Sequence, residues 1–458
     1  MTNGNPAELL DQRPLSRLQI TVWVLCVLVA MMDGFDTQAI GYVAPAIVQA
    51  WGISKLALGP VFSAGLVGSL LGALIFGPSA DRFGRKPVLI VCASIFGLAA
   101  LATANAESTL VLLGLRFVTG LGMGGAMPIA IAQTSEFMPR RIRGFAMTLT
   151  YCGFSAGAAL GGLAADQLIQ RFSWQSVFIA GSVPTLVLVF CMVFWLPESI
   201  SFLLSHDDTR GRAKIILGKL GLNPSEIRYS AWRSDKLALT TAVGRLFTDG
   251  RAPITAAIWL IVFMNLVELY FFTSWLPTVI HGVGISIGLA ALVTALFQVG
   301  GTLGALAIGR LIDIFRKFRV MCCVFFSAAV FVTSVGYLLS HTDSSWAFVS
   351  IACAVTLAGV CVVGGQIGII AVTATIYPTE IRSAGVGWAL GIGRIGSVVG
   401  PFIGSALIAG QLPIFELFLI GAVPVVIAGS TSLWLDAFTL RMAQATAPQP
   451  DTTSLAVR

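Results

Sequence analysis

Long apolar runs recur through this chain, and they constrain its fold more than any other feature. A helix needs about 20 apolar residues to cross the hydrocarbon core of a bilayer. Only 11% of the residues are charged, against about 25% in a soluble domain. Twelve runs of suitable length lie at 19–46, 56–78, 87–106, 109–135, 144–168, 175–196, 254–278, 288–312, 319–340, 346–375, 384–409 and 413–436. The sequence therefore predicts an all-α polytopic membrane protein of twelve transmembrane helices.

The first apolar run is too long for a signal-peptide core, which spans about 7–15 residues. A second run follows it closely, so we expect the first to be a retained helix. The eight cysteines all lie inside the runs, without the CxxC spacing typical of metal ligands. We interpret them as packed free thiols and expect no metal or cofactor.

Basic residues are distributed very unevenly between the two sides of the predicted membrane. With a cytoplasmic N-terminus, 24 of the 28 Lys and Arg residues fall on the cytoplasmic side. Only Lys55 and Arg171 fall on the opposite side, and two arginines lie within runs. This asymmetry follows the positive-inside rule and predicts that both termini are cytoplasmic. It accounts for the net charge of +7 without a nucleic-acid partner.

A long polar stretch divides the runs into two sets of six. We predict a cytoplasmic tail at 1–18, a six-helix bundle at 19–197, a cytoplasmic loop at 198–253, a second bundle at 254–437 and a cytoplasmic tail at 438–458. The segment DTRGRAKIILGKLG, residues 208–221, predicts a short amphipathic helix on the membrane face. The loop is too short for a catalytic domain with its own core.

The two halves repeat one another at equivalent junctions. GPSADRFGRKP follows the second run and GRLIDIFRKFR follows the eighth, each with Asp four residues after Gly (Gly77 and Asp81, Gly309 and Asp313). PRRIRG and PTEIRS follow the fourth and tenth runs, and aligning their prolines pairs Arg143 with Arg382. Duplication of a six-helix unit is indicated, and such halves usually enclose a substrate site near the membrane midplane.

The first of these loops resembles the cytoplasmic signature of the major facilitator superfamily. Gly-x-x-x-Asp-Arg-x-Gly-Arg-Lys is matched at every defining position from Gly77 to Lys86. The second copy keeps Arg310, Asp313 and Lys317 but lacks the Gly-Arg pair. With the twelve runs and the half-repeat, the resemblance covers essentially the whole chain. It implies two pseudo-symmetric six-helix bundles and transport by alternating access.

The signature loop is expected to form a cytoplasmic gate. Gly84 permits a tight turn, and Glu136 at the end of the fourth run is placed to pair with Arg85. In the superfamily such a cluster holds the outward-open state, with Asp81 facing a helix N-terminus of the other half. The alternative is that these residues only set topology and a turn. The expected gate comprises Gly77, Asp81, Arg82, Gly84, Arg85, Glu136, Asp313 and Arg382.

Two aspartates interrupt the first apolar run, in MMDGFDTQAIGYVAPAI. A charge at the bilayer centre costs about 2.5–3.5 kcal/mol on insertion scales, so these carboxyls indicate function. Asp33 and Asp36 share one helix face. At 1.5 Å per residue, Asp36 lies roughly 25 Å along its helix and Arg116 roughly 10 Å along the fourth, at similar depth. They are predicted to pair, or Arg116 receives an anion while Asp36 manages protons. A static ion pair, a weak contributor to stability, is the alternative.

Further polar residues lie inside the later runs. Glu268 is a third buried acid, either a partner of Arg394, a proton carrier or a structural acid. Arg394 is expected to face a cavity or a partner, because an intramembrane cation normally does. Glycines recur every four residues in the fifth and eleventh runs, which allows close helix approach. They are Gly153, Gly157 and Gly161, and Gly396, Gly400 and Gly404.

The motif around the two aspartates also resembles a narrower family. DGFDTQAIGYVAPAI is similar to the first-helix signature of the aromatic acid:proton symporters, whose Asp-Gly-x-Asp core is matched by Asp33, Gly34 and Asp36. LPESISFLL and YPTEIRSAGVG fit the same group less specifically. The resemblance implies that six residues matter for transport: Asp33, Asp36, Arg116, Glu136, Arg382 and Arg394.

These observations predict a bacterial inner-membrane symporter that imports a small aromatic carboxylate, such as 4-hydroxybenzoate or protocatechuate, with protons. Proton coupling is expected from Asp33, Asp36 and Glu268. The expected substrate contacts are Arg116, Arg394, Tyr42, Gln298, Gln366, Trp275 and Trp388. The alternatives are another cargo on the same fold, namely a sugar, a dicarboxylate or an exported drug, or a membrane receptor for aromatic acids. We expect neither enzymatic activity nor an obligate protein partner, since no nucleophile triad or metal cluster is evident.

Overall fold

The computed structural model describes residues 11, 13–205, 211–220, 244–248, 250–342, 346–378 and 381–446. Every regular element in these ranges is a helix. Parts of the predicted tails and of the predicted loop at 198–253 lie outside the described residues. The long helices of the first half are α2 (Arg17–Trp51), α3 (Leu58–Phe83), α4 (Arg85–Thr103), α5 (Thr109–Phe137), α6 (Arg140–Arg171) and α7 (Gln175–Trp195).

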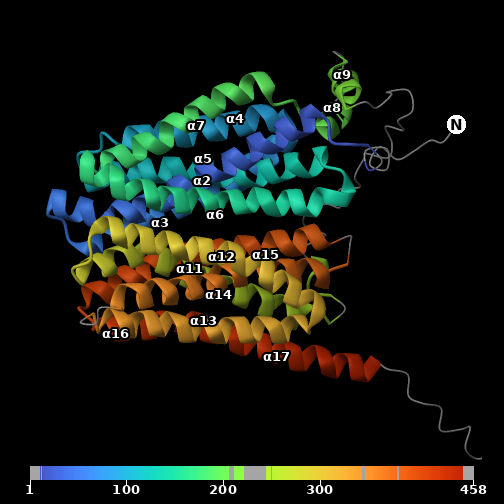
Figure 1. Cartoon of the computed structure of the whole chain (residues 1–458). Coiled ribbons are helices and arrows are strands. Elements are labelled where there is room, and N and C mark those ends of the chain that lie inside the picture. The colour runs from blue at the N-terminus through green and yellow to red at the C-terminus, as the bar shows by residue number, and fades with distance from the viewer. Residues whose placement is uncertain are drawn as a thin grey trace, which may run out of the picture.

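The second half repeats this order. Its helices are α11 (Ala252–Gly282), α12 (Ile287–Ile314), α13 (Lys317–Leu339), α14 (Ala347–Ile376), α15 (Arg382–Ala409) and the successive pair α16 (Ile414–Gly421) and α17 (Val423–Thr446). Figure 1 shows the two sets as two bundles lying side by side, with α2 to α7 in one and α11 to α17 in the other. The all-α two-bundle architecture predicted from the sequence is confirmed.

Eleven stretches of the described chain are long and apolar enough to cross a membrane. The twelfth predicted span corresponds to α6, a helix of 32 residues that lies outside this set. Glycine, serine and threonine lower its hydropathy, and several of these residues are buried against other helices. A helix packed within a bundle needs less lipid-facing apolar surface, so α6 is consistent with the twelfth predicted span.

The predicted amphipathic helix of the central loop is present in part. α8 (Ile200–Ser205) and α9 (Arg212–Lys219) follow α7. Ile216 and Leu217 of α9 are buried in the hydrophobic core of the first half, whereas Lys214 and Lys219 are exposed. Residues 206–210 and 221–243 lie outside the described ranges. The amphipathic pattern therefore holds one short helix against the end of the first bundle.

The half-repeat is preserved down to single contacts. The backbone N–H of Ile142 donates to the Pro139 carbonyl at 3.2 Å, and that of Ile381 donates to the Pro378 carbonyl at 3.1 Å. Arg143 donates to the carbonyl of the residue five positions earlier at 3.3 Å, and Arg382 does the same at 3.5 Å. The alignment of PRRIRG with PTEIRS thus pairs residues with the same local structure.

Glycines bring equivalent helix pairs into backbone contact in both halves. A Cβ on Gly157 of α6 would overlap the carbonyl of Met31 in α2. In the second half, a Cβ on Gly400 of α15 would overlap the carbonyl of Val267 in α11. The glycine spacing read from the sequence therefore marks close packing of α2 with α6 and of α11 with α15.

The two halves are packed together toward one end of the molecule. We call the end that carries Arg85, Arg140 and Arg382 the basic end. Toward the opposite end, Gln49 of α2 lies 2.7 Å from the His281 ring of α11, and Ser63 of α3 donates to a carbonyl of α15 at 2.9 Å. These contacts join the two halves toward the opposite end.

A carboxylate also lies against a helix N-terminus at the end opposite the basic end. The Asp166 side chain of α6 lies so close to Gly288, in the first turn of α12, that a Cβ there would overlap it. Gln167 and Gln170 both donate to this carboxylate. A helix N-terminus carries partial positive charge, so the contact favours joining the halves here.

Candidate functional site

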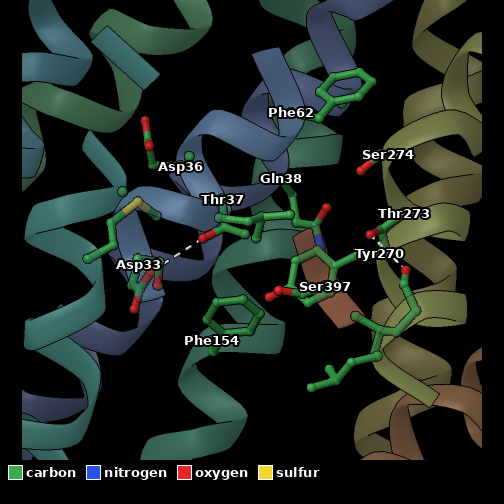
Figure 2. A pocket seen from close by; sticks show the side chains of 18 of the residues that line it. Asp33, Asp36, Thr37, Gln38, Phe62, Phe154, Tyr270, Thr273, Ser274 and Ser397 are labelled. Atoms are coloured by element: carbon green, nitrogen blue, oxygen red, sulfur yellow. Dashed lines mark hydrogen bonds between the residues drawn. The ribbon is translucent and has the colours of Figure 1, made fainter. Parts of the chain in front are cut away.

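A cavity of about 260 Å³ lies between the two halves. Pockets for drug-sized ligands occupy about 300–1,000 Å³, so this one suits a small molecule. Its walls come from α2, α3, α5 and α6 of one half and from α11, α12, α14 and α15 of the other. Figure 2 shows polar side chains of α2 and α11 facing one another across it.

Asp36 and Arg116 form a buried ion pair at the first-half wall. The guanidinium nitrogen lies 3.0 Å from the carboxylate, and both side chains are about 95% buried. Arg116 also donates to the hydroxyls of Thr103 and Thr119 at 3.2 Å and lies over the Phe178 ring. The pairing predicted from helix depth is confirmed. These contacts hold Arg116 within the first half, although it borders the cavity.

Asp33 lies one turn away from Asp36 and has a different environment. Thr37 donates to its carboxylate at 3.3 Å, as Figure 2 shows. Asp33 is 5% exposed and has no ion-pair partner among the described residues. The two aspartates are therefore inequivalent: Asp36 has a direct ion pair, whereas Asp33 is hydrogen-bonded to a hydroxyl and interacts with the Arg394 charge only through space.

Arg394 reaches from the second half to the first. Its guanidinium donates to the backbone carbonyl of Ser69 in α3 at 2.8 Å and to the Ser69 hydroxyl at 3.0 Å. Both residues line the cavity. The predicted cavity-facing cation is present, and its partner is a neutral serine.

Glu268 lies outside the cavity lining and does not pair with Arg394. The α11 residues that face the cavity are Leu266, Leu269, Tyr270, Thr273 and Ser274. Glu268 is fully buried on another face of this helix, and neither carboxylate oxygen has a hydrogen-bond partner in the described chain. One of its three predicted roles, the partner of Arg394, is therefore wrong for this conformation, because Arg394 extends toward α3.

Of the predicted substrate contacts, the two glutamines line the cavity and the three aromatic residues do not. Gln298 of α12 and Gln366 of α14 line the cavity as predicted. Tyr42, Trp275 and Trp388 do not. Tyr42 donates to a carbonyl of α6 at 2.8 Å, and Trp275 donates to a carbonyl of α15 at 3.0 Å, so both join helices.

Trp388 lies near the basic end of α15 and stacks on Trp259, so its predicted substrate contact is also absent here. Four other aromatic residues line the cavity instead: Phe62, Tyr151, Phe154 and Tyr270. No sequence signal separated these four from the many aromatic residues that face lipid or core.

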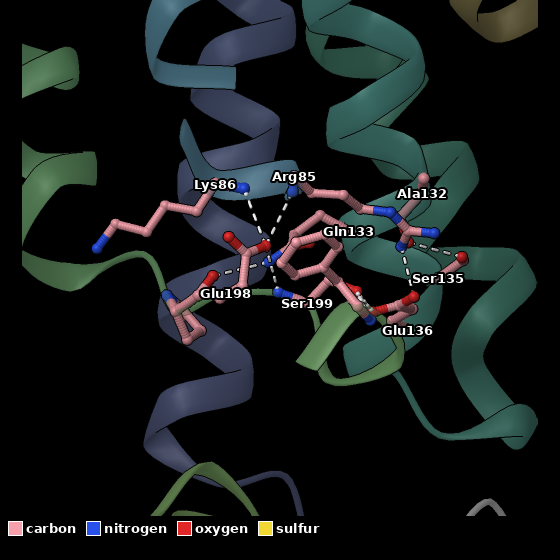
Figure 3. Close-up of polar contacts among 10 residues, drawn as sticks. Arg85, Lys86, Ala132, Gln133, Ser135, Glu136, Glu198 and Ser199 are labelled. Atoms are coloured by element: carbon pink, nitrogen blue, oxygen red, sulfur yellow. Dashed lines mark hydrogen bonds and ion pairs between the residues drawn. The ribbon is translucent and has the colours of Figure 1, made fainter. Parts of the chain in front are cut away.

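A polar cluster at the basic end contains the predicted Arg85–Glu136 pair, with 2.6 Å between nitrogen and oxygen. We call Arg85, Glu136, Glu198 and Ser199 the basic-end cluster. Figure 3 shows Glu198 receiving the backbone N–H groups of Arg85 and Lys86, at 2.8 and 3.2 Å. Ser199 donates to Glu136 at 2.6 Å. Glu198 thus caps the N-terminus of α4, a role that the sequence motif LPES did not reveal.

Gly84 connects α3 to α4 with a backbone φ of +102°, which side-chain-bearing residues rarely adopt. A Cβ there would also overlap the Glu198 carboxylate. The predicted tight turn is present. Of the other predicted gate residues, Gly77, Asp81 and Arg82 lie in the last two turns of α3, and Asp313 lies in the last turn of α12.

Comparison with known proteins identifies the fold and the family. The Major Facilitator Superfamily model matches residues 26–278 and 258–454. The chain belongs to the major facilitator superfamily. Among solved superfamily structures, the xylose transporter XylE of E. coli in a partially occluded inward open conformation has a TM-score of 0.69. It is 17% identical, and the match covers 93% of this chain and 98% of XylE.

Within the superfamily, the chain is most informatively compared with transporters of aromatic acids. It is 38% identical to the 4-hydroxybenzoate transporter PcaK of Pseudomonas aeruginosa, over 87% of this chain and 88% of that protein. It is 38% identical to a gallate transporter of Pseudomonas putida, over 91% of each. The benzoate transport protein of Acinetobacter baylyi is 30% identical over 92% of this chain and 91% of its own length. The predicted resemblance to the aromatic acid:proton symporter family is confirmed.

The two halves of this chain anchor their third long helix in a similar way. In the first half, Glu198 caps α4. In the second, Asp436 of α17 pairs with Arg316 at 2.9 Å, directly before α13 begins. An acid at the end of the last span therefore holds the start of the third span in both halves, even though the second loop lacks the Gly-Arg pair.

Proposed function

We propose that this protein imports a small aromatic carboxylate together with protons, by alternating access of its two halves. One observation carries the proposal. A single cavity contains a cation that reaches across the halves, Arg394, and an acid, Asp33, that makes no direct ion pair but lies within the electrostatic reach of that cation. Relatives named as transporters of 4-hydroxybenzoate, gallate and benzoate support an aromatic acid as the cargo.

The proposed location is the bacterial inner membrane, with both termini in the cytoplasm. Supporting this orientation, the basic end carries most of the Lys and Arg residues, in accordance with the positive-inside rule. The conformation described above then faces inward, because its halves are joined at the periplasmic end. In the outward-facing state we expect Asp81 to approach a helix N-terminus of the second half, with the basic-end cluster, Asp313 and Arg382 at the closing face.

Arg394 is the favoured ligand for the substrate carboxylate. Arg116 already pairs with Asp36, and breaking a buried pair leaves an uncompensated charge. The hydrogen-bond partner of Arg394, Ser69, is neutral, and Asp33 acts on Arg394 only through space, so a substrate carboxylate offers Arg394 a stronger, charge-assisted bond. The ring would then lie among Phe154, Tyr151 and Tyr270, which line the same cavity.

A hydroxylated ring suits the remaining lining better than an unsubstituted one. Gln298, Gln366 and several hydroxyl side chains border the cavity, and the side-chain oxygen of Gln366 has no partner in the described structure. A site with buried polar groups disfavours an analogue that leaves them unpaired. We therefore propose a hydroxybenzoate, such as 4-hydroxybenzoate or protocatechuate, as the cargo.

Asp33 is the favoured proton carrier, with Asp36 and Glu268 as further candidates. A charged acid without a direct ion pair is costly to carry through a closed state. Protonation of Asp33 removes that cost, which lets the loaded carrier close and turn over. Glu268 is fully buried in the second half without a partner and carries the same cost when charged.

Uptake into proteoliposomes tests the proposal directly. Radiolabelled 4-hydroxybenzoate should accumulate when the outside is made acidic, and a protonophore should abolish accumulation. Two protons per monoanion would also make transport electrogenic, adding about 2.3 kcal/mol of driving force per 100 mV. Currents on a solid-supported membrane decide the stoichiometry. Equal accumulation with and without a pH gradient, in the absence of a membrane potential, would contradict proton coupling.

A further inference from the structure

Ser69 offers Arg394 two oxygen atoms from a single residue. The backbone carbonyl accepts from one guanidinium nitrogen at 2.8 Å, and the side-chain hydroxyl accepts from the same nitrogen at 3.0 Å. The hydroxyl and carbonyl thus occupy a donor of Arg394 that a carboxylate would otherwise receive. Ser69 and Arg394 both border the cavity, at its first-half and second-half walls.

The position of this serine carbonyl is fixed by helix packing. A Cβ on Gly124 of α5 would overlap the Ser69 carbonyl, so α3 and α5 are in backbone contact here. A carbonyl oxygen has two lone pairs and can accept a second hydrogen bond beside its helical one. The first half therefore presents a rigid acceptor to Arg394 from the second half.

We infer that Ser69 is a placeholder acceptor that holds Arg394 while the cavity is empty and releases it to the carboxylate of the cargo. The inference rests on the proposed function and names a residue that sets its specificity. An intramembrane guanidinium without acceptors is costly, so the empty carrier needs such a contact. Bonds from a guanidinium to a neutral oxygen are weaker than those to a carboxylate, so the exchange favours an anionic cargo.

The exchange has a consequence for selectivity and for movement. A neutral ring compound provides no anion to compete for Arg394 and leaves the contact with Ser69 intact. A carboxylate displaces Ser69 from Arg394 and thereby removes a hydrogen-bonded contact between the two halves. Loading then changes the relative free energies of the carrier's conformations, which tight binding alone does not do.

Ser69→Ala tests the inference, and Ser63→Ala is its matched control. Both serines lie on α3 and bond to α15, but the Ser63 hydroxyl donates to the Val398 carbonyl at 2.9 Å and does not contact Arg394. Dissociation constants are measured on the purified full chain for 4-hydroxybenzoate and for its neutral amide, 4-hydroxybenzamide. Thermal melting and gel filtration of each variant verify that it is folded.

Removing one neutral acceptor should tighten 4-hydroxybenzoate binding about two- to tenfold, because less is lost when Arg394 leaves Ser69. The amide should bind Ser69→Ala as it binds the wild type, and Ser63→Ala should leave the acid-to-amide ratio unchanged. Weaker acid binding by Ser69→Ala, or an equal change for acid and amide in both variants, overturns the inference. If the wild type binds no aromatic acid at all, the proposed function fails and the inference fails with it. Binding by the wild type with an unaltered ratio in Ser69→Ala removes the placeholder role alone.

Discussion

Arg116 of α5 donates to Asp36 of α2 across 3.0 Å, and both side chains are about 95% buried at the wall of the cavity. The same guanidinium bonds two threonines and lies over the Phe178 ring. This ion pair holds α2 against α5 at the first-half wall of the cavity. Breaking it should affect both stability and transport, which can be measured separately.

Asp36→Leu alone should lower stability by about 3–5 kcal/mol, because it leaves the Arg116 charge buried and unpaired. The double variant Asp36→Leu with Arg116→Met should recover most of that loss, since an apolar pair of similar volume replaces the ion pair. Denaturation in detergent, followed by tryptophan fluorescence, measures both. We expect no uptake by either variant. Normal uptake by the stable double variant would show that the pair is only structural.

Asp33→Asn should separate proton coupling from binding. No direct ion pair is broken, because Thr37 donates the side-chain hydrogen bond to Asp33 and Arg394 acts on Asp33 only through space. Accumulation driven by a pH gradient should therefore be lost, while exchange of labelled for unlabelled substrate persists at a rate within a fewfold of wild type. Counterflow and gradient-driven uptake are compared in the same proteoliposomes. Glu268→Gln, assayed alongside, reports whether the second half contributes a proton. Retained accumulation in Asp33→Asn would exclude this residue as the carrier.

Gly84→Ala should destabilise the protein by about 1–3 kcal/mol, since its backbone conformation is strained for a residue with a side chain. The new methyl group would also disturb Glu198, which caps α4. Gly144→Ala is the matched control: Gly144 lies in α6 near the basic end, and a Cβ added there would meet no other atom within 4 Å. Melting temperatures of the two variants in detergent should differ by several degrees. Equal melting temperatures would argue against a strained turn.

Gly288→Ala should weaken the closure of the end opposite the basic end. The methyl group would displace the Asp166 carboxylate from the first turn of α12. Gly309→Ala, in the same helix with open space around it, is the control. Distances between spin labels at the exposed positions Glu107 and Thr342 report opening of this end. We expect a longer-distance population in Gly288→Ala only. Identical distributions in both variants would mean that Asp166 does not hold this end closed.

The sequence was sufficient for the fold and for contacts that depend on depth along a helix. Apolar run length located the spans, and the rise per residue placed Asp36 opposite Arg116. Motif spacing likewise placed Glu136 beside Arg85. These inferences need only the depth of each residue in the membrane, which follows from its position along a spanning helix.

Rotation about the helix axis could not be read from the sequence. α11 is apolar on almost every face, so nothing in its pattern showed that Tyr270 faces the cavity while Glu268 and Trp275 face other helices. The partner of Arg394 was missed for a related reason. A serine in a glycine-rich apolar helix carries no signal, and its backbone carbonyl supplies the shorter of the two bonds.

The glycine contacts between α2 and α6 have a practical consequence for watching this carrier at work. Where two backbones touch, no side chains lie between them to rearrange, so the pair should keep one separation through the whole cycle. The distance between probes on α3 and α15, which belong to different halves, should change during the cycle. A labelled α2–α6 pair therefore provides an internal reference distance, against which other distance changes in the same sample can be calibrated.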